Sequence, residues 1–106
     1  MSEFVFVAEV ASLPPGKGRT VEVRGHRFAL WNRDGEFLAI DDDCPHRGAS
    51  LGAGIMDGGQ VYCPLHGWAF DPKTGACSSN PARPVKCHRV KVEDGKVYLG
   101  IGEAGH

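Results

Sequence analysis

The sequence lacks an excess of charge of one sign, a long apolar run and a high density of cysteine. Lys and Arg number 12 and Asp and Glu number 13, for a formal net charge of −1 at pH 7. A chain without a basic excess lacks the attraction to phosphates on which general nucleic-acid binding depends. No apolar run approaches the roughly 20 residues needed to cross a bilayer. We therefore expect neither a nucleic-acid partner nor a membrane span.

The N-terminal segment also lacks the features of a secretory signal. It carries no basic residue before the acidic Glu9, and its apolar run is short. Four cysteines in 106 residues are too few for a disulfide scaffold. We expect a cytoplasmic protein, in which reduced cysteines serve as metal ligands or as buried thiols.

Helical periodicity is missing as well, since no window of 11 or more residues keeps an apolar repeat of 3.6. Short alternating runs are instead separated by turn signals at Arg24-Gly25, Asp34-Gly35 and Asp94-Gly95. Residues 11–16 read as a turn or a short helical bend. The pattern predicts one all-β domain over residues 1–106, with strands at residues 4–7, 21–23, 28–30, 37–40, 90–92 and 97–99.

The middle of the chain, from about residue 41 to residue 84, breaks this pattern. It is rich in glycine and proline and holds three of the four cysteines. A loop-rich segment of this length is uncommon inside a small domain. A bound metal would organise it.

Two short motifs in that segment each offer one sulfur and one nitrogen donor: Cys44-Pro45-His46 and Cys63-Pro64-Leu65-His66. Thiolate and imidazole are the usual soft and borderline metal ligands. The prolines stiffen both loops, and a glycine closely follows each motif, where the backbone can approach a bound group. The motifs predict one centre, held by Cys44, His46, Cys63 and His66.

Spacing alone leaves other interpretations open. One is a chance arrangement of core cysteines and surface histidines. Another is a structural zinc ion, although zinc sites usually pair cysteines on one arm and histidines on the other.

The motifs resemble the Rieske family of [2Fe-2S] proteins, whose pattern is C-x-H, a spacer of about this length, and C-x-x-H. The resemblance covers essentially the whole chain, including Asp43-Cys44-Pro45-His46-Arg47-Gly48, Cys63-Pro64-Leu65-His66-Gly67-Trp68, Phe70-Asp71, Thr74-Gly75 and Asn80-Pro81-Ala82-Arg83-Pro84. It implies a small antiparallel β-sandwich or barrel-like base with an inserted cluster-binding subdomain at about residues 41–84. It also implies one [2Fe-2S] cluster per chain, with Cys44 and Cys63 on the inner iron and His46 and His66 on the outer iron.

The function that this resemblance implies is one-electron transfer. The chain would accept an electron from a flavin or iron–sulfur reductase and pass it to an oxygenase through the edge formed by His46 and His66. An alternative is the small subunit of an NAD(P)H-dependent assimilatory nitrite reductase, with the large subunit as its partner. A zinc-stabilised binding module without a redox role is a further alternative. No nucleophile triad or phosphate-binding loop is present, so we do not expect substrate chemistry by this chain alone.

Two histidine ligands leave the oxidised core neutral, which raises the potential to about −150 to +300 mV, against about −400 mV for plant-type ferredoxins. High-potential family members add a disulfide between the loops and two hydroxyl groups after the second histidine. This chain has Ala49 and Leu65 at the disulfide positions and Trp68 and Phe70 at the hydroxyl positions. These four residues predict a centre of low reduction potential, near or below about −150 mV.

Several residues outside the motifs carry simpler expectations. We expect Cys77 and Cys87 to be buried free thiols rather than a disulfide. We expect Asp41-Asp42-Asp43 to form a solvated acidic turn, with steering of a basic redox partner as the alternative.

We expect Trp68 and Phe70 to pack beneath the second loop, with the apolar Leu65 near the histidine tip as a possible docking contact. No ligand role is expected for His26, His88 or His106.

Overall fold

The computed structural model describes residues 3–45, 48–65 and 67–101. In those ranges the chain forms ten β-strands and two 3-10 turns, and no α-helix. No helix in the described part of the chain is long and apolar enough to cross a membrane. The elements are β1 (Glu3–Glu9), η1 (Val10–Ser12), β2 (Gly18–Val23), β3 (His26–Arg33), β4 (Glu36–Asp41), η2 (Leu51–Ala53), β5 (Ile55–Asp57), β6 (Gln60–Tyr62), β7 (Ala69–Phe70), β8 (Cys87–His88), β9 (Val90–Glu93) and β10 (Lys96–Ile101).

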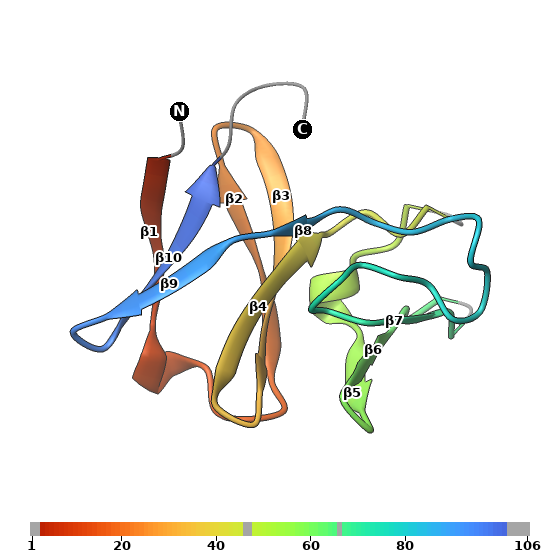
Figure 1. Cartoon of the computed structure of the whole chain (residues 1–106), viewed down its shortest axis with the longest axis horizontal. Coiled ribbons are helices and arrows are strands. Elements are labelled where there is room, and N and C mark those ends of the chain that lie inside the picture. Colours follow the sequence, from red (N-terminus) through yellow and green to blue (C-terminus); the bar gives the residue numbers. More distant parts are fainter. Residues whose placement is uncertain (1–2, 46–47, 66, 102–106) are drawn as a thin grey trace.

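Two antiparallel sheets form the base of the molecule. One has the strand order β1-β10-β9 and the other the order β2-β3-β4-β8. A third small sheet, in the order β5-β6-β7, lies in the segment between β4 and β8. Figure 1 shows this segment projecting to one side of the base. We call residues 42–86 the inserted lobe. The predicted all-β fold, with an insertion in an antiparallel base, is confirmed.

Four hairpin turns share one backbone geometry, in which both central residues have positive φ. In three of them an Arg or Asp precedes the glycine: Arg24-Gly25, Asp34-Gly35 and Asp94-Gly95. Such turns match the right-handed twist of the flanking strands, and glycine adopts them at little steric cost. The three predicted hairpins are therefore present. The fourth, Gly58-Gly59 between β5 and β6, is a two-glycine hairpin signal that was not among the predicted turns.

Strand β3 is buried on both faces and separates two hydrophobic cores. Phe28 and Leu30 belong to the first core, which fills the space between the base sheets. Ala29 and Trp31 belong to the second core, which lies beneath the inserted lobe. Because both faces need apolar side chains, β3 has a continuous apolar run in place of strict alternation.

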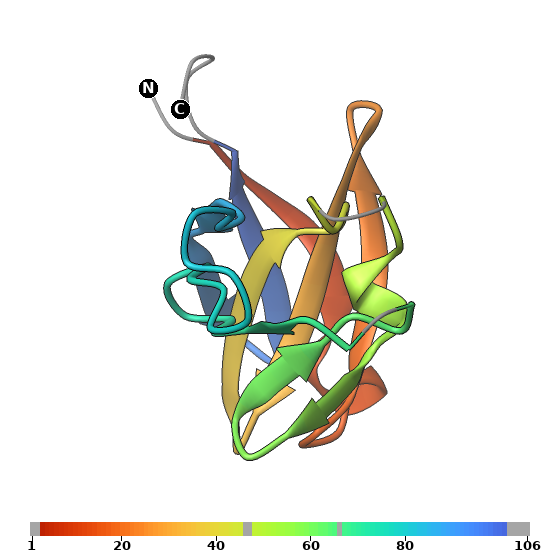
Figure 2. The same ribbon diagram turned by 90° about the vertical axis from the view of Figure 1, so that its right-hand side faces the viewer.

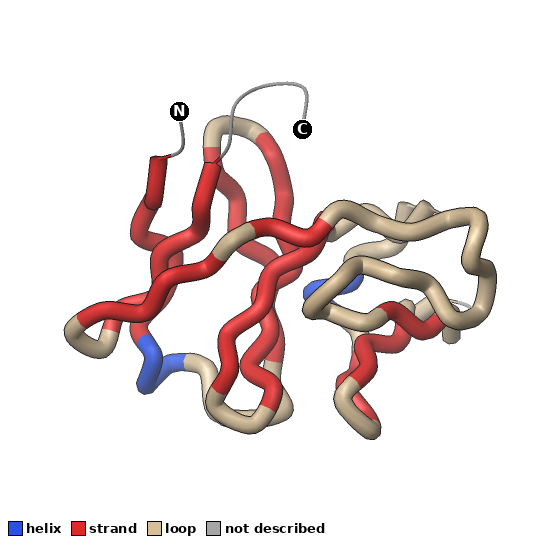
Figure 3. The backbone as a smooth tube through the Cα atoms, in the orientation of Figure 1, coloured by secondary structure: helices blue, strands red, loops and turns tan. Residues whose placement is uncertain are grey.

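The inserted lobe consists mostly of loops, as Figure 3 shows, and Figure 2 views it face on. Its second core contains apolar side chains from the lobe together with three cysteines: Leu51, Val61, Phe70, Val85, Cys44, Cys63 and Cys77. The lobe thus covers one face of the β2-β3-β4-β8 sheet.

The chain returns from the lobe through β8 and then changes sheets. β8 pairs with β4, whereas β9 pairs with β10. Between them lies Arg89, whose carbonyl accepts a hydrogen bond from the Gly100 N–H (2.7 Å). In the sequence, Val85 and Cys87 occupy odd positions whereas Val90 and Val92 occupy even positions. The change of sheet accounts for this reversal of the apolar alternation.

Gly75 lies where the lobe is tightly packed. Its φ is +83°, and a Cβ there would lie 2.0 Å from the Val85 carbonyl oxygen. We expect Gly75→Ala to destabilise the protein by about 2–5 kcal/mol, combining left-handed strain with a steric clash. Gly58→Ala is the matched control, because Gly58 has a φ of +62° with nothing within 4 Å. It should cost about 1–2 kcal/mol. Equal urea midpoints for the two variants would contradict the packing described here.

Candidate metal centre

The first cysteine loop, residues 44–49, closes on itself through two backbone hydrogen bonds. The Cys44 N–H donates to the Ala49 carbonyl (2.9 Å), and the Gly48 N–H donates to the Cys44 carbonyl (2.7 Å). Gly48 has a φ of +72°, a conformation that glycine adopts readily. The cysteine therefore stands at the base of a closed turn.

The second cysteine loop, residues 63–68, repeats this arrangement. The Cys63 N–H donates to the Trp68 carbonyl (2.8 Å), and the Gly67 N–H donates to the Cys63 carbonyl (3.0 Å). Gly67 has a φ of +73°. A Cβ at either Gly48 or Gly67 would meet nothing within 4 Å, so the backbone conformation, rather than lack of space, requires glycine at both positions.

The thiols at the bases of the two loops are buried in the same core. Cys44 is 1% exposed and Cys63 is 3% exposed. In the second loop, by contrast, Pro64 and Leu65 are exposed. A centre bound here would have a buried sulfur side, with solvent-facing residues next to it.

The donor set fits a group that takes two cysteine ligands, because two buried soft donors come from two similarly shaped loops. The other two predicted ligands, His46 and His66, lie outside the described residues. Within the described residues, no three His, Cys, Asp or Glu side chains group closely enough to hold a metal. Cys77, 2% exposed in the same core, therefore does not complete a site with Cys44 and Cys63.

The expectation of a solvated acidic turn at Asp41-Asp42-Asp43 is wrong. Asp42 is fully buried, and its Oδ1 accepts hydrogen bonds from Thr20 Oγ1 (3.0 Å), Ser50 Oγ (3.0 Å) and the Gly52 N–H (2.8 Å). The carboxylate thereby joins β2 to both ends of the segment that carries the first cysteine loop. A pattern of three consecutive aspartates does not reveal which one points inward.

The other two aspartates have basic partners. Asp43 forms an exposed ion pair with Arg27. Asp41 Oδ1 lies 2.7 Å from His88 Nε2, and the Asp41 N–H donates to the Lys86 carbonyl (2.9 Å). Asp41 and His88 stand where the chain enters and leaves the inserted lobe, so their contact fastens the two connections together.

Burial by itself raises the pKa of Asp41. The hydrogen bond and charge of His88, together with the backbone N–H and charge of Lys86, outweigh burial and hold this pKa below its ordinary value of 3.8. His88 also packs edge-on against Phe28, with ring centroids 4.8 Å apart. His88 thus has a structural role in the described structure, and His26 is exposed on β3.

The residues after the second motif lie as expected. Phe70 is fully buried in the second core, and Trp68 packs against that core while half-buried. Leu65 is 54% exposed. The free cysteines are only partly as expected, because Cys77 is buried but Cys87 is exposed. Cys87 lies on the two-residue edge strand β8, where no further strand covers it.

The family model and the relatives that match this chain agree with each other. The profile of the Rieske [2Fe-2S] domain matches residues 3–94. The 3-phenylpropionate/cinnamic acid dioxygenase ferredoxin subunit of Photorhabdus laumondii is 42% identical over 101 residues, which cover 93% of this chain and 95% of that protein.

Two solved structures have the same fold over nearly their whole length. One is a chain from the complex of reduced oxygenase and oxidised ferredoxin in carbazole 1,9a-dioxygenase, with a TM-score of 0.83, 35% identity and 91% of each chain covered. The other is named as an NADH-dependent nitrite reductase small subunit from Mycobacterium tuberculosis. Its TM-score is 0.90 at 25% identity, with 98% of this chain and 99% of that chain covered.

The Asp41–His88 contact predicts a defined acid dependence. Because the pKa of Asp41 is depressed in the folded protein, its stabilising effect is fully present above pH 3.8 and is lost as pH falls through the lower folded-state pKa. We expect Asp41→Asn to lower the urea midpoint at pH 5 and to approach the wild-type midpoint as pH falls below 3.8.

The exposed Asp57 on β5 provides the control. Asp57→Asn should stay close to the wild-type midpoint at every pH. A constant difference between Asp41→Asn and the wild type from pH 5 down to acid unfolding would show that Asp41 does not stabilise the fold through its charge.

Proposed function

This chain belongs to the Rieske [2Fe-2S] domain family, and we propose that it serves as the ferredoxin component of an aromatic-ring dioxygenase. Its cofactor is a [2Fe-2S] cluster, and it acts as an electron carrier. The observation that supports the dioxygenase role most strongly is the 42% identity to a dioxygenase ferredoxin subunit over 93% of this chain. The cluster site itself is supported by the repeated closed turn that begins at Cys44 and at Cys63. Two buried thiols at the bases of these turns form the sulfur half of the ligand set that the family pattern requires.

We assign Cys44 and Cys63 to one iron and His46 and His66 to the other. When bound, the cluster supplies reversible one-electron oxidation and reduction. The chain keeps the cysteine side of the site away from water, since both thiols are almost fully buried. It leaves Leu65 of the second loop half-exposed, where this side chain would contact a redox partner.

The partners follow from the relatives. One relative is a dioxygenase ferredoxin subunit, and one similar structure is a complex of an oxygenase with its ferredoxin. As an electron carrier it also needs a donor, and we propose a flavin or iron–sulfur reductase in that role. Cys63, Cys77 and Cys87 are free thiols, which suits the reducing cytoplasm that we infer for it.

The nitrite reductase small subunit is the second candidate, because a structure of that name shares the fold with a TM-score of 0.90. Sequence identity favours the dioxygenase role, at 42% for the ferredoxin subunit against 25% for that structure. The zinc-stabilised module is not supported, because the family carries an iron–sulfur cluster.

The choice of partner can be tested by reconstitution. We expect the reduced protein to support turnover by an oxygenase of the 3-phenylpropionate/cinnamic acid dioxygenase type, and not by a nitrite reductase large subunit. Cys63→Ser should abolish turnover. Cys77→Ser should preserve it, because Cys77 is equally buried but begins neither of the two closed turns. Electron transfer to the nitrite reductase alone would favour the second candidate, and full activity of Cys63→Ser would contradict the ligand assignment.

The reduction potential is predicted to be low. The side chains at Ala49, Leu65, Trp68 and Phe70 carry neither a thiol for a disulfide nor a hydroxyl to donate to the cluster. Fewer hydrogen bonds to the sulfurs leave the reduced state less stabilised. Protein-film voltammetry should give a midpoint near or below about −150 mV, and a midpoint well above zero would contradict this prediction.

A further inference from the structure

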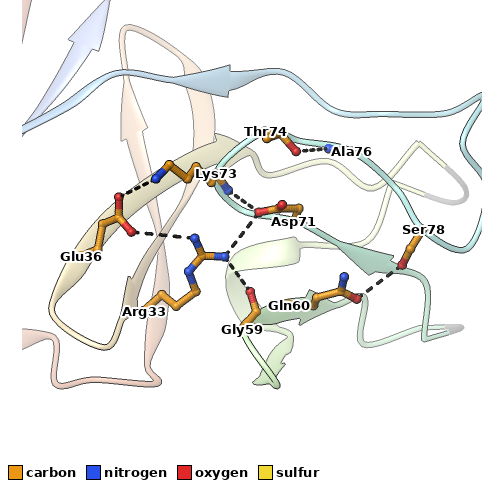
Figure 4. Close-up of polar contacts among 9 residues, drawn as sticks. All are labelled: Arg33, Glu36, Gly59, Gln60, Asp71, Lys73, Thr74, Ala76 and Ser78. Carbon is orange, nitrogen blue, oxygen red and sulfur yellow. Dashed lines mark hydrogen bonds and ion pairs between the residues drawn. The ribbon is translucent and has the colours of Figure 1, made fainter.

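A network of four charged residues joins the inserted lobe to the base at the end of the β3–β4 hairpin (Figure 4). Arg33 and Glu36 belong to the base, and Asp71 and Lys73 belong to the lobe. Glu36 pairs with Lys73 (3.5 Å) and with Arg33 (3.8 Å). Of the two base residues, Arg33 is the one that contacts the backbone of the lobe.

The guanidinium group of Arg33 contacts two separate segments of the lobe. Its Nη1 donates to the Gly59 carbonyl (3.1 Å) and lies 3.4 Å from Asp71 Oδ1. The side chain is 24% exposed. Gly59 has a φ of +81°, and a Cβ there would lie 3.4 Å from Arg33 Cδ, so the arginine stem passes close to the turn.

These two contacts lie at the open end of the hairpin that carries the second cysteine loop. Gly59 directly precedes β6, and Asp71 directly follows β7. Between them, β6 and β7 pair at Val61↔Phe70 and Tyr62↔Ala69. At the far end, the hairpin closes through the bond between the Cys63 N–H and the Trp68 carbonyl.

Asp71 is itself held in place by the turn that follows it. Its Oδ1 accepts the Lys73 N–H (2.9 Å), and its carbonyl accepts the Gly75 N–H (2.7 Å). The Asp71 N–H donates to the Ala76 carbonyl (2.8 Å). Arg33 therefore connects the base to a fixed carboxylate rather than to a freely rotating one.

We propose that Arg33 is a positioning residue, which sets the orientation of the second cysteine loop, residues 63–68, relative to the base by holding both strands of its hairpin. The inference rests on the proposed function, because that loop would carry two of the four cluster ligands. Gly59 lies four residues before Cys63, so the hairpin acts as a lever of about 13 Å at roughly 3.3 Å per residue. Functional groups need placement within about 0.5 Å. A small rotation of the hairpin about the Arg33 contacts would therefore displace the ligands in the second loop enough to affect the cluster.

The simpler alternative is a surface ion-pair network that adds little to stability and does nothing else. Arg33→Lys separates the two, because lysine keeps the positive charge but lacks the planar fork whose Nη1 contacts Gly59 and Asp71 while its Nη2 faces Glu36. Arg33→Gln removes the charge as well. Lys73→Gln is the matched control, since the Lys73 side chain joins the same network through Glu36 alone.

The test compares amide hydrogen exchange and the electron paramagnetic resonance spectrum of the reduced, cluster-loaded proteins. We expect exchange over residues 60–68 to rise about tenfold in Arg33→Lys and Arg33→Gln, with altered g values in both. Exchange in β1 should not change. Lys73→Gln should match the wild type in both measurements.

The proposal is overturned if both Arg33 variants keep wild-type exchange over residues 60–68 and a wild-type spectrum, or if Lys73→Gln changes as much as they do. If Arg33→Gln does not fold, Arg33→Lys decides the matter, because it preserves the charge. A wild-type protein without a reducible cluster would instead refute the proposed function. The exchange comparison would still report on Arg33 in that case.

Discussion

Two cysteine thiols lie beneath loops that close through the same pair of backbone hydrogen bonds. In each loop the closure depends on a glycine with positive φ, four residues after the cysteine. This conformation brings the backbone back on itself and leaves the thiol facing the second core. An isolated thiol buried in an apolar core is chemically quiet, whereas a pair of thiols from two matching loops can ligate one iron.

The rest of the molecule keeps these loops in place. Strand β3 contributes side chains to both cores, so the sheet beneath the lobe is packed on both faces. Buried Asp42 ties the first loop segment to β2, and the contact between Asp41 and His88 joins the strands by which the chain enters and leaves the lobe. Arg33 connects the base to the hairpin of the second loop. Polar contacts from the base therefore reach both cysteine loops.

Local sequence signals were sufficient for the parts of the fold that depend on local chemistry. The turns at Arg24-Gly25, Asp34-Gly35 and Asp94-Gly95 were predicted because paired positive-φ residues have a characteristic composition. The roles of Asp42 and Cys87 were not predicted, because burial depends on which segment packs above a residue. Asp42 is covered by the η2 segment, whereas Cys87 lies on an uncovered edge. The contacts of Arg33 span up to 38 positions in sequence, beyond the reach of any local pattern.

A carrier of single electrons needs a redox group that is held firmly on one side and reachable on the other. The buried thiols, with exposed Pro64 and Leu65 in the second loop, meet this need. The most direct test is the iron and acid-labile sulfide content of protein purified without oxygen. The account predicts about two irons and two sulfides per chain, with both lost when Cys44 and Cys63 are replaced by serine. A colourless protein that holds zinc, or that holds no metal, would contradict it.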